Sequence, residues 1–129
     1  MPDSDDVRVH KEAAVDFLQL VIAGHIDEAY QKHVDMQGKH HNPWIGAGFA
    51  SLKQAMLENH MQMPNKQLTV KNVVGDGDMV AVHSRLTLRS GEPGMAVVHI
   101  FRFQGNRIVE MWDIGEATPA ESPNADGRF

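Results

Sequence analysis

The sequence predicts an α+β domain in which three N-terminal helices pack on one face of a curved antiparallel sheet. Apolar residues recur at helical spacing in the first half of the chain and at alternating positions from residue 68 onward. Glycine-rich turns separate the alternating stretches, as is typical of consecutive antiparallel strands. A length of 129 residues fits one domain with its own core, so we expect a single domain over 1–129 that ends in an irregular tail at 117–129.

Helical spacing and end signals define the helices. The first begins at Ser4, a residue type that caps helix N-termini, and ends at Gly24, a common helix stop. The three predicted helices are residues 4–24, 26–34 and 49–61. The polar segment 37–43, which ends in a proline, is expected to be a loop.

Four strands follow the helices. Their predicted ranges are 68–74, 79–88, 95–103 and 107–114. Each junction carries glycine, which adopts the positive φ that tight turns require. The predicted turns are Gly75-Asp76-Gly77, 90–94 and Gln104-Gly105-Asn106.

The composition excludes several classes of function. A formal net charge of −5 argues against a nucleic-acid or anionic-membrane partner, because such partners bind basic patches. The absence of cysteine removes disulfides, thiolate nucleophiles and cysteine metal sites. No apolar run approaches the ~18 residues of a membrane span, and the acidic N-terminus is unlike a signal peptide. We therefore expect a cytoplasmic protein.

Alternation along the last two strands assigns their side chains to faces of the sheet. His99 is the single polar residue on one face of strand 95–103, and Asp113 is a carboxylate on an otherwise apolar face of strand 107–114. The apolar residues that share these faces are Met95, Val97, Phe101, Phe103, Val109 and Met111.

The opposite face of strand 107–114 carries a second apolar set, formed by Ile108, Trp112 and Ile114. An exposed apolar patch on a sheet favours a homodimer through that face. Alternatively, the C-terminal tail covers the patch.

The connecting turn decides whether His99 and Asp113 meet. A two-residue loop would place His99 opposite Trp112 and Asp113 on the other face, whereas a three-residue loop would place Asp113 diagonally beside His99. We favour the three-residue loop, because it groups the apolar residues of both strands on one face.

A carboxylate beside a histidine in an apolar pocket is suited to proton transfer. Burial raises the pKa of a carboxyl group towards neutrality, while a neighbouring imidazolium lowers it. A group poised near the working pH can remove a proton next to a carbonyl. The alternative is a buried hydrogen-bonded pair that only fixes the register of the sheet.

Other polar residues have weaker indications. His40 and His41 are adjacent and would point to opposite sides of an extended segment, which is poor geometry for one metal, and no HExxH spacing occurs. A metal site assembled in space from His33, His60 and His83 stays open. His10, His25 and His33 are expected to be solvated positions on helices. Trp44 is expected either in the core or as a pocket wall.

The order of these elements and motifs resembles the SnoaL-like polyketide cyclase family, within the cone-shaped folds of nuclear transport factor 2 and ketosteroid isomerase (the cystatin-like fold). The matching segments are His41-Asn42-Pro43 with Gly46, residues 75–84, residues 96–103, residues 107–113 and the ending 124–129. The resemblance covers nearly the whole chain.

The resemblance implies an intramolecular aldol condensation on a carbonyl substrate, and it implies no metal or cofactor. Asp113 corresponds to the family's acid/base, His99 to a histidine close to it, and Asn42 to a pocket asparagine. The sequence departs from many relatives at His99, where they carry aspartate, and at Met111, where they carry histidine. The expected substrate-binding residues are Asn42, His41, Trp44, Met111, Phe101 and Val97.

Two alternatives come from other classes. One is a non-catalytic small-molecule-binding domain with the same pocket. The other is isomerase-like or epoxide hydrolase-like activity; hydrolysis would need a carboxylate–arginine–carboxylate set. Arg85 and Arg102 are the candidate arginines, although Arg102 is predicted on the wrong face.

Overall fold

The computed structural model describes residues 3–129. It contains three helices and a single sheet, and all but one of the strands follow the last helix. The helices are α1 (Asp5–Ile22), α2 (Ile26–His33) and α3 (Phe49–Gln62). The Ser4 side chain accepts a hydrogen bond from the Val7 amide at 3.2 Å and so caps α1. Gly24 has φ 90° just beyond the end of α1, which confirms the predicted helix stop.

The sheet has five strands in the order β1-β5-β4-β3-β2. The strands are β1 (Val34–His40), β2 (Gln67–Asp76), β3 (Met79–Thr87), β4 (Met95–Gln104) and β5 (Arg107–Ala117). From β2 to β5 neighbouring strands are antiparallel, whereas β1 pairs with β5 in parallel. The sheet is therefore mixed, and not purely antiparallel as the sequence suggested.

The strand β1 lies at an edge of the sheet, where the sequence had predicted a loop over 37–43. Only Val34 among its residues is buried. An edge strand of this kind is held by backbone hydrogen bonds and not by an apolar face, so it leaves no alternating pattern in the sequence.

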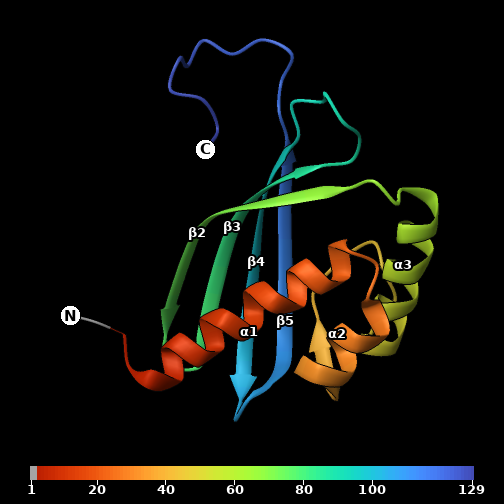
Figure 1. Cartoon of the computed structure of the whole chain (residues 1–129), viewed down its shortest axis with the longest axis vertical. Coiled ribbons are helices and arrows are strands. Elements are labelled where there is room, and N and C mark those ends of the chain that lie inside the picture. Colours follow the sequence, from red (N-terminus) through yellow and green to blue (C-terminus); the bar gives the residue numbers. More distant parts are fainter. Residues whose placement is uncertain (1–2) are drawn as a thin grey trace.

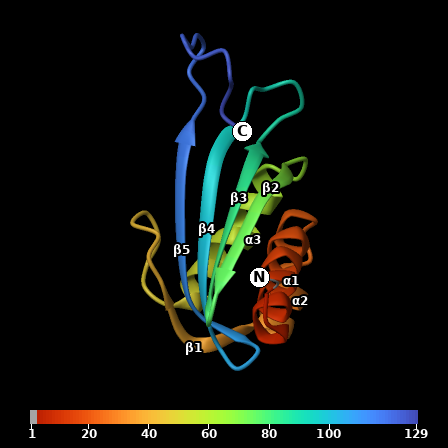
Figure 2. The same cartoon turned by 90° about the vertical axis from the view of Figure 1, so that its left-hand side faces the viewer.

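The three helices cover one face of the sheet, and no helix lies on the other face within the described chain (Figure 1, Figure 2). The core between helices and sheet contains a chain of aromatic rings. The ring of Phe17 lies 5.4 Å from Tyr30 and 5.9 Å from Phe101, and Tyr30 lies 6.2 Å from Phe49. These rings are fully buried or nearly so, and they fix the helices against β4.

The turn between β4 and β5 differs from the one we favoured. Gln104 pairs with Arg107, so the loop is the two-residue Gly105-Asn106. The register then shifts, because Phe103 pairs with Ile108 while Arg102 pairs with Glu110. This β-bulge moves every later residue of β5 to the opposite face from the one a regular two-residue hairpin would give it.

The bulge has two consequences for the predicted faces. His99 comes to lie directly opposite Asp113, an arrangement that neither loop length alone produces. Ile108, predicted on the outer face, lies in the core with no exposed surface. The prediction that His99 and Asp113 share a face is correct, although the three-residue loop behind it is wrong.

Two histidines predicted to be solvated are buried instead. His10 on α1 stacks on Phe103, with ring centroids 4.4 Å apart, and its Nε2 lies 2.8 Å from the Gly105 carbonyl oxygen. His33 at the end of α2 lies 2.6 Å from an Asp16 carboxylate oxygen. Both make contacts distant in sequence that helical spacing cannot reveal. His25 is exposed, as expected.

The tail from residue 118 turns back towards the sheet. Arg128 donates to the Ala117 carbonyl at 2.9 Å, and the Phe129 ring lies 6.0 Å from the His83 ring. Ile114 on the outer face remains 61% exposed, so the tail does not cover it. No helix in residues 3–129 is both long and apolar enough to cross a membrane.

Candidate active-site cleft

Asp113 and His99 lie at one end of the sheet, in a cleft of about 550 Å³. The walls come from the loop 41–44, from the inner faces of β3 and β4, and from residues 113–115 of β5. Because β1 runs parallel to β5, the chain leaves β1 beside Asp113. The backbone amide of His41 donates to the Met111 carbonyl at 2.9 Å, which anchors the start of the loop.

Asn42 is bonded directly to Asp113. Its side-chain Nδ2 donates to Asp113 Oδ2 at 2.9 Å, while its Oδ1 accepts from the Trp44 amide at 2.9 Å. The second bond holds the amide group in the orientation in which its nitrogen faces the carboxylate. Asn42 therefore orients one carboxylate oxygen and leaves the other free.

The free oxygen, Asp113 Oδ1, is buried and has no hydrogen-bond partner among the described residues. The same is true of His99 Nδ1. No hydrogen bond joins the two side chains within residues 3–129, so they do not form the bonded structural pair considered above. Buried polar atoms without partners are costly, and a bound ligand with matching polar groups would satisfy them.

The charge state of His99 follows from its surroundings. Burial lowers the pKa of His99 to about 4, although the nearby Asp113 charge acts in the opposite direction. The imidazole is therefore neutral near pH 7, with one nitrogen able to donate and the other able to accept a hydrogen bond. The neighbour of Asp113 is thus neutral and not the imidazolium that we considered from the sequence.

Tyr30 is a further polar group near Asp113. Burial raises the pKa of Tyr30 above its usual value, and the charge of Asp113 adds to the rise. Its hydroxyl donates to the Met56 sulfur at 3.1 Å, a weak acceptor. Helical spacing puts Tyr30 on the apolar side of its helix and gives no sign of its place near Asp113.

His41 contributes to the cleft wall, but its ring is engaged elsewhere. Its Nε2 lies 2.6 Å from Glu110 Oε2, and the ring stacks on Trp112 at 4.9 Å. Arg102 Nε also donates to Glu110, at 2.9 Å. The His41 hydrogen bond, then the Arg102 hydrogen bond, hold the pKa of Glu110 below its usual range. His41 thus belongs to a hydrogen-bonded group with Glu110 and Arg102 on the face of β5 opposite Asp113.

The comparisons with known proteins agree with this architecture. The family model described as the SnoaL-like domain matches residues 8–111. The chain belongs to the SnoaL-like family. No curated protein matches it in sequence.

Solved structures of the SnoaL-like and related types show the same fold. A provisionally assigned SnoaL-like polyketide cyclase from Jannaschia sp. CCS1 superposes with a TM-score of 0.75 at 16% identity, over 90% of this chain and 91% of that one. A provisionally assigned ketosteroid isomerase from Kribbella flavida gives 0.73 at 18% identity, over 92% and 86%. A provisionally assigned polyketide cyclase from Acidithiobacillus ferrooxidans gives 0.68 at 22%, over 90% and 92%. At these identities the likeness concerns the fold.

Against the expectations from the SnoaL-like resemblance, the structure separates the candidate residues into two groups. Val97 and Trp44 line the cleft, and Trp44 stands 91% exposed at its mouth. Met111 and Phe101 do not line it, because both are buried in the core with 1% and 0% exposure. Phe101 faces inward from β4 to meet Phe17, a contact that face assignment alone cannot distinguish from a pocket wall.

The two candidate arginines lie outside the cleft. Arg102 pairs with Glu110 on the outer face, as predicted. Arg85 donates to the carbonyl oxygens of Pro93 and Glu92 at 3.1 and 3.3 Å. Among the residues that line the cleft, Asp113 is the only carboxylate and none is arginine. In the part of the chain that the structure describes, no three His, Asp or Glu side chains are grouped to hold a metal ion.

Proposed function

We propose that this SnoaL-like protein is an enzyme that uses Asp113 as an acid/base on a carbonyl-containing small molecule. The proposal depends on one observation. Asp113 Oδ1 and His99 Nδ1 are both buried without a hydrogen-bond partner among the described residues, and the two residues lie opposite each other in the same cleft. A structural role would leave these atoms bonded to protein groups.

In the proposed reaction, Asp113 Oδ1 removes a proton from the carbon next to a substrate carbonyl, and the electron pair of that C–H bond forms an enolate. The enolate carbon then attacks a second carbonyl carbon of the same molecule, and a carbon–carbon bond closes a ring. The oxygen of the second carbonyl takes the proton back from Asp113. The result is an intramolecular aldol addition, the ring-closing step of an aldol condensation, and the carboxylate is regenerated.

The neighbouring groups support these steps. The neutral His99 donates a hydrogen bond to the oxygen on which negative charge develops. Because its pKa is lowered, His99 is not an imidazolium that would form an ion pair with Asp113. Asn42 holds Asp113 through Oδ2 and directs Oδ1 towards the substrate. The apolar Val97, Met95 and Leu86 supply a surface for a flat carbon skeleton.

Proton exchange tests the proposal without knowledge of the natural substrate. The probes are α-tetralone and acetophenone in deuterated buffer, with loss of the α-proton signal followed by NMR. We expect catalysed exchange with the native protein and a loss of about 10²-fold or more with Asp113→Asn. Asp126→Asn, in the exposed tail, is the matched control and should not change the rate.

Equal exchange rates for native protein and Asp113→Asn would contradict the role of Asp113. Binding of these ketones by NMR titration, without exchange in either protein, would instead favour the ligand-binding alternative. Epoxide hydrolysis has no support in the cleft, because its lining within the described chain has neither the arginine nor the second carboxylate that this chemistry would need.

We further propose that a second copy of the chain binds the outer face of the sheet. This face has exposed apolar residues, with Ile114 on β5 at 61% and Val74 on β2 at 62%, and it also carries the internally neutralised pair Arg102–Glu110. Such a surface can meet its own copy without repulsion between like charges. Size-exclusion chromatography with light scattering should give the mass of a dimer for the native protein and that of a monomer for Ile114→Asp. A monomer mass for the native protein would contradict the proposal.

A further inference from the structure

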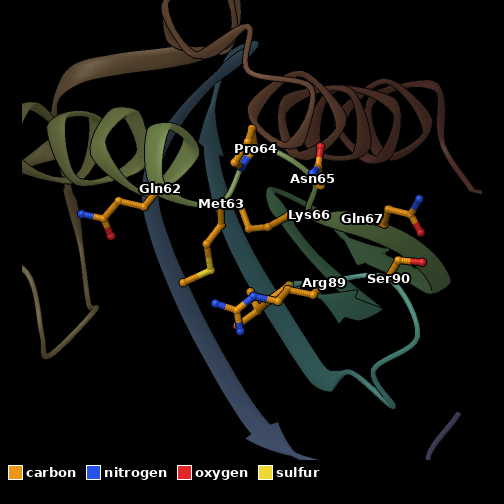
Figure 3. Close-up of a pocket in the computed structure, with 9 residues that line it drawn as sticks. Gln62, Met63, Pro64, Asn65, Lys66, Gln67, Arg89 and Ser90 are labelled. Carbon is orange, nitrogen blue, oxygen red and sulfur yellow. The ribbon is translucent and has the colours of Figure 1, made fainter.

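A second cleft, of about 650 Å³, shares none of the residues that line the Asp113 cleft. Figure 3 shows that its side chains come from two facing segments: the end of α3 with the loop into β2, and the stretch that follows β3. Neutral polar groups such as Asn65, Gln67 and Ser90 form part of its wall. The SnoaL-like resemblance and the proposed chemistry assign nothing to this cleft.

The cleft has the opposite sign of charge to the chain as a whole. The formal net charge of the protein is −5, yet among the described residues 3–129 the charged ones that line the cleft are Lys66 and Arg89. No carboxylate lines it among the described residues. Arg89 has only a loose contact with Glu92 at 3.7 Å, and its side chain is 75% exposed, so its guanidinium can turn to a ligand.

Lys66 is the more unusual of the two cations. It is half-buried, and its amine donates to Asn59 Oδ1, a neutral acceptor on α3. No carboxylate lies within ion-pair distance of it in residues 3–129. Burial lowers the pKa of the Lys66 amine, because the charged form is less well solvated where the side chain is half-buried. An anion in the cleft would supply the missing counter-charge.

We propose that this cleft binds a small organic anion, whose carboxylate or phosphate oxygens are held by Lys66 and Arg89. Both side chains offer several N–H donors, and their hydrogen bonds to an anion are charge-assisted. The neutral polar residues of the wall would bind the uncharged part of the ligand. The site is independent of the acid/base chemistry proposed for Asp113.

Isothermal titration of the full chain with succinate, citrate and inorganic phosphate tests the site, with succinamide as the uncharged counterpart of succinate. We expect binding of at least one anion and none of succinamide. Lys66→Gln and Arg89→Gln should each weaken binding about tenfold or more, the loss expected for one charge-assisted hydrogen bond. Tighter binding of phosphate than of succinate and citrate would identify the phosphate class, and the reverse order would identify the carboxylate class.

Matched controls remove the same charges elsewhere. Lys71→Gln on β2 and Arg8→Gln on α1 leave the cleft intact and should change the affinity less than twofold, because exposed charges act weakly at a distance. Asp113→Asn should also leave anion binding unchanged. Equal losses in the controls and in the cleft variants would overturn the site, as would the absence of binding by any of the three anions.

Lys66 also supplies a direct spectroscopic test. After reductive ¹³C-methylation, the NMR signal of Lys66, assigned from its loss in Lys66→Gln, should titrate at a lower pH than those of the other lysines. Adding the anion that binds should raise that midpoint, because a bound anion favours the charged amine. An unchanged midpoint at saturating anion would overturn the proposal even if weak binding occurs. Arg89→Gln keeps the test valid if Lys66→Gln fails to fold.

Discussion

Gly38 and Val109 meet where the parallel edge of the sheet crosses the bulge of β5. A β-carbon on Gly38 would strike the Val109 carbonyl oxygen and would lie 2.8 Å from the Phe49 ring. The pairing of β1 with β5 is irregular between Val34 and Lys39, beside the bulge that separates Ile108 from Glu110. The close approach of the two backbones therefore accompanies the register that sets His99 opposite Asp113.

Gly38→Ala should destabilise the protein by about 1–3 kcal/mol, because the new methyl group meets backbone atoms that cannot move aside cheaply. Urea unfolding followed by circular dichroism measures the change. Gly46→Ala is the control, since the nearest atom to its β-carbon is at 3.5 Å. An unchanged unfolding midpoint for Gly38→Ala would show that β1 can move away from the bulge without cost.

Asn42→Ala should lower the ketone exchange rate roughly tenfold while leaving the cleft folded, because Asp113 loses the hydrogen bond that orients it. The loss should appear mainly in the exchange step and not in ketone affinity, since Asn42 contacts the carboxylate. NMR exchange rates at several ketone concentrations separate the two. Asn124→Ala, in the tail, removes another asparagine side chain and should have no effect. Full activity of Asn42→Ala would contradict the positioning role.

The stability of the protein should fall as the pH decreases from about 6.5 to about 4, in part because of His99. The pKa of His99 is lowered to about 4 from 6.5, so the unfolded chain binds this proton at higher pH than the folded one. Stability is then greatest above the unfolded pKa and is lost as the pH falls towards the folded value. The contribution of His99 is at most about 3 kcal/mol by the usual conversion of pKa shifts.

Urea unfolding at pH 7, 5.5 and 4.5 measures this dependence. His99→Gln should show a weaker decrease than the native protein, because glutamine binds no proton. His25→Gln removes an exposed histidine and should follow the native curve. Parallel curves for all three proteins would show that His99 titrates alike in the folded and unfolded states.

Gly24→Ala should cost about 1–2 kcal/mol for two separable reasons. Its φ of 90° is in the left-handed region that side chains avoid, and a β-carbon there would strike the His60 ring. In the background His60→Ala the collision disappears while the backbone strain remains. Comparing Gly24→Ala in the two backgrounds by thermal unfolding should show a smaller cost with His60→Ala, and an equal cost would assign the whole effect to the backbone.

Much of the fold follows from local chemistry and could be predicted. The cap at Ser4, the stop at Gly24 and the apolar stripe of α1 specify that helix, and all depend on residues within a few positions of each other. Alternation places Val97, His99 and Phe101 on one face of β4, because a strand has no freedom to do otherwise. These rules made Asp113 and His99 candidates and assigned Arg102 to the opposite face.

The sequence by itself thus determined the helices, four of the strands and the two residues on which the proposed chemistry depends. Only the tertiary structure decided that His99 and Asp113 lie opposite each other. That register depends on the bulge at Val109, which lies beside Gly38, a residue 71 positions earlier in the chain. The same holds for β1, for the bond from Asn42 to Asp113 and for the turning of His41 towards Glu110. The physical reason is that strand register and hydrogen bonds between distant residues depend on which segments pack together. Local sequence patterns carry no information about which segments these are.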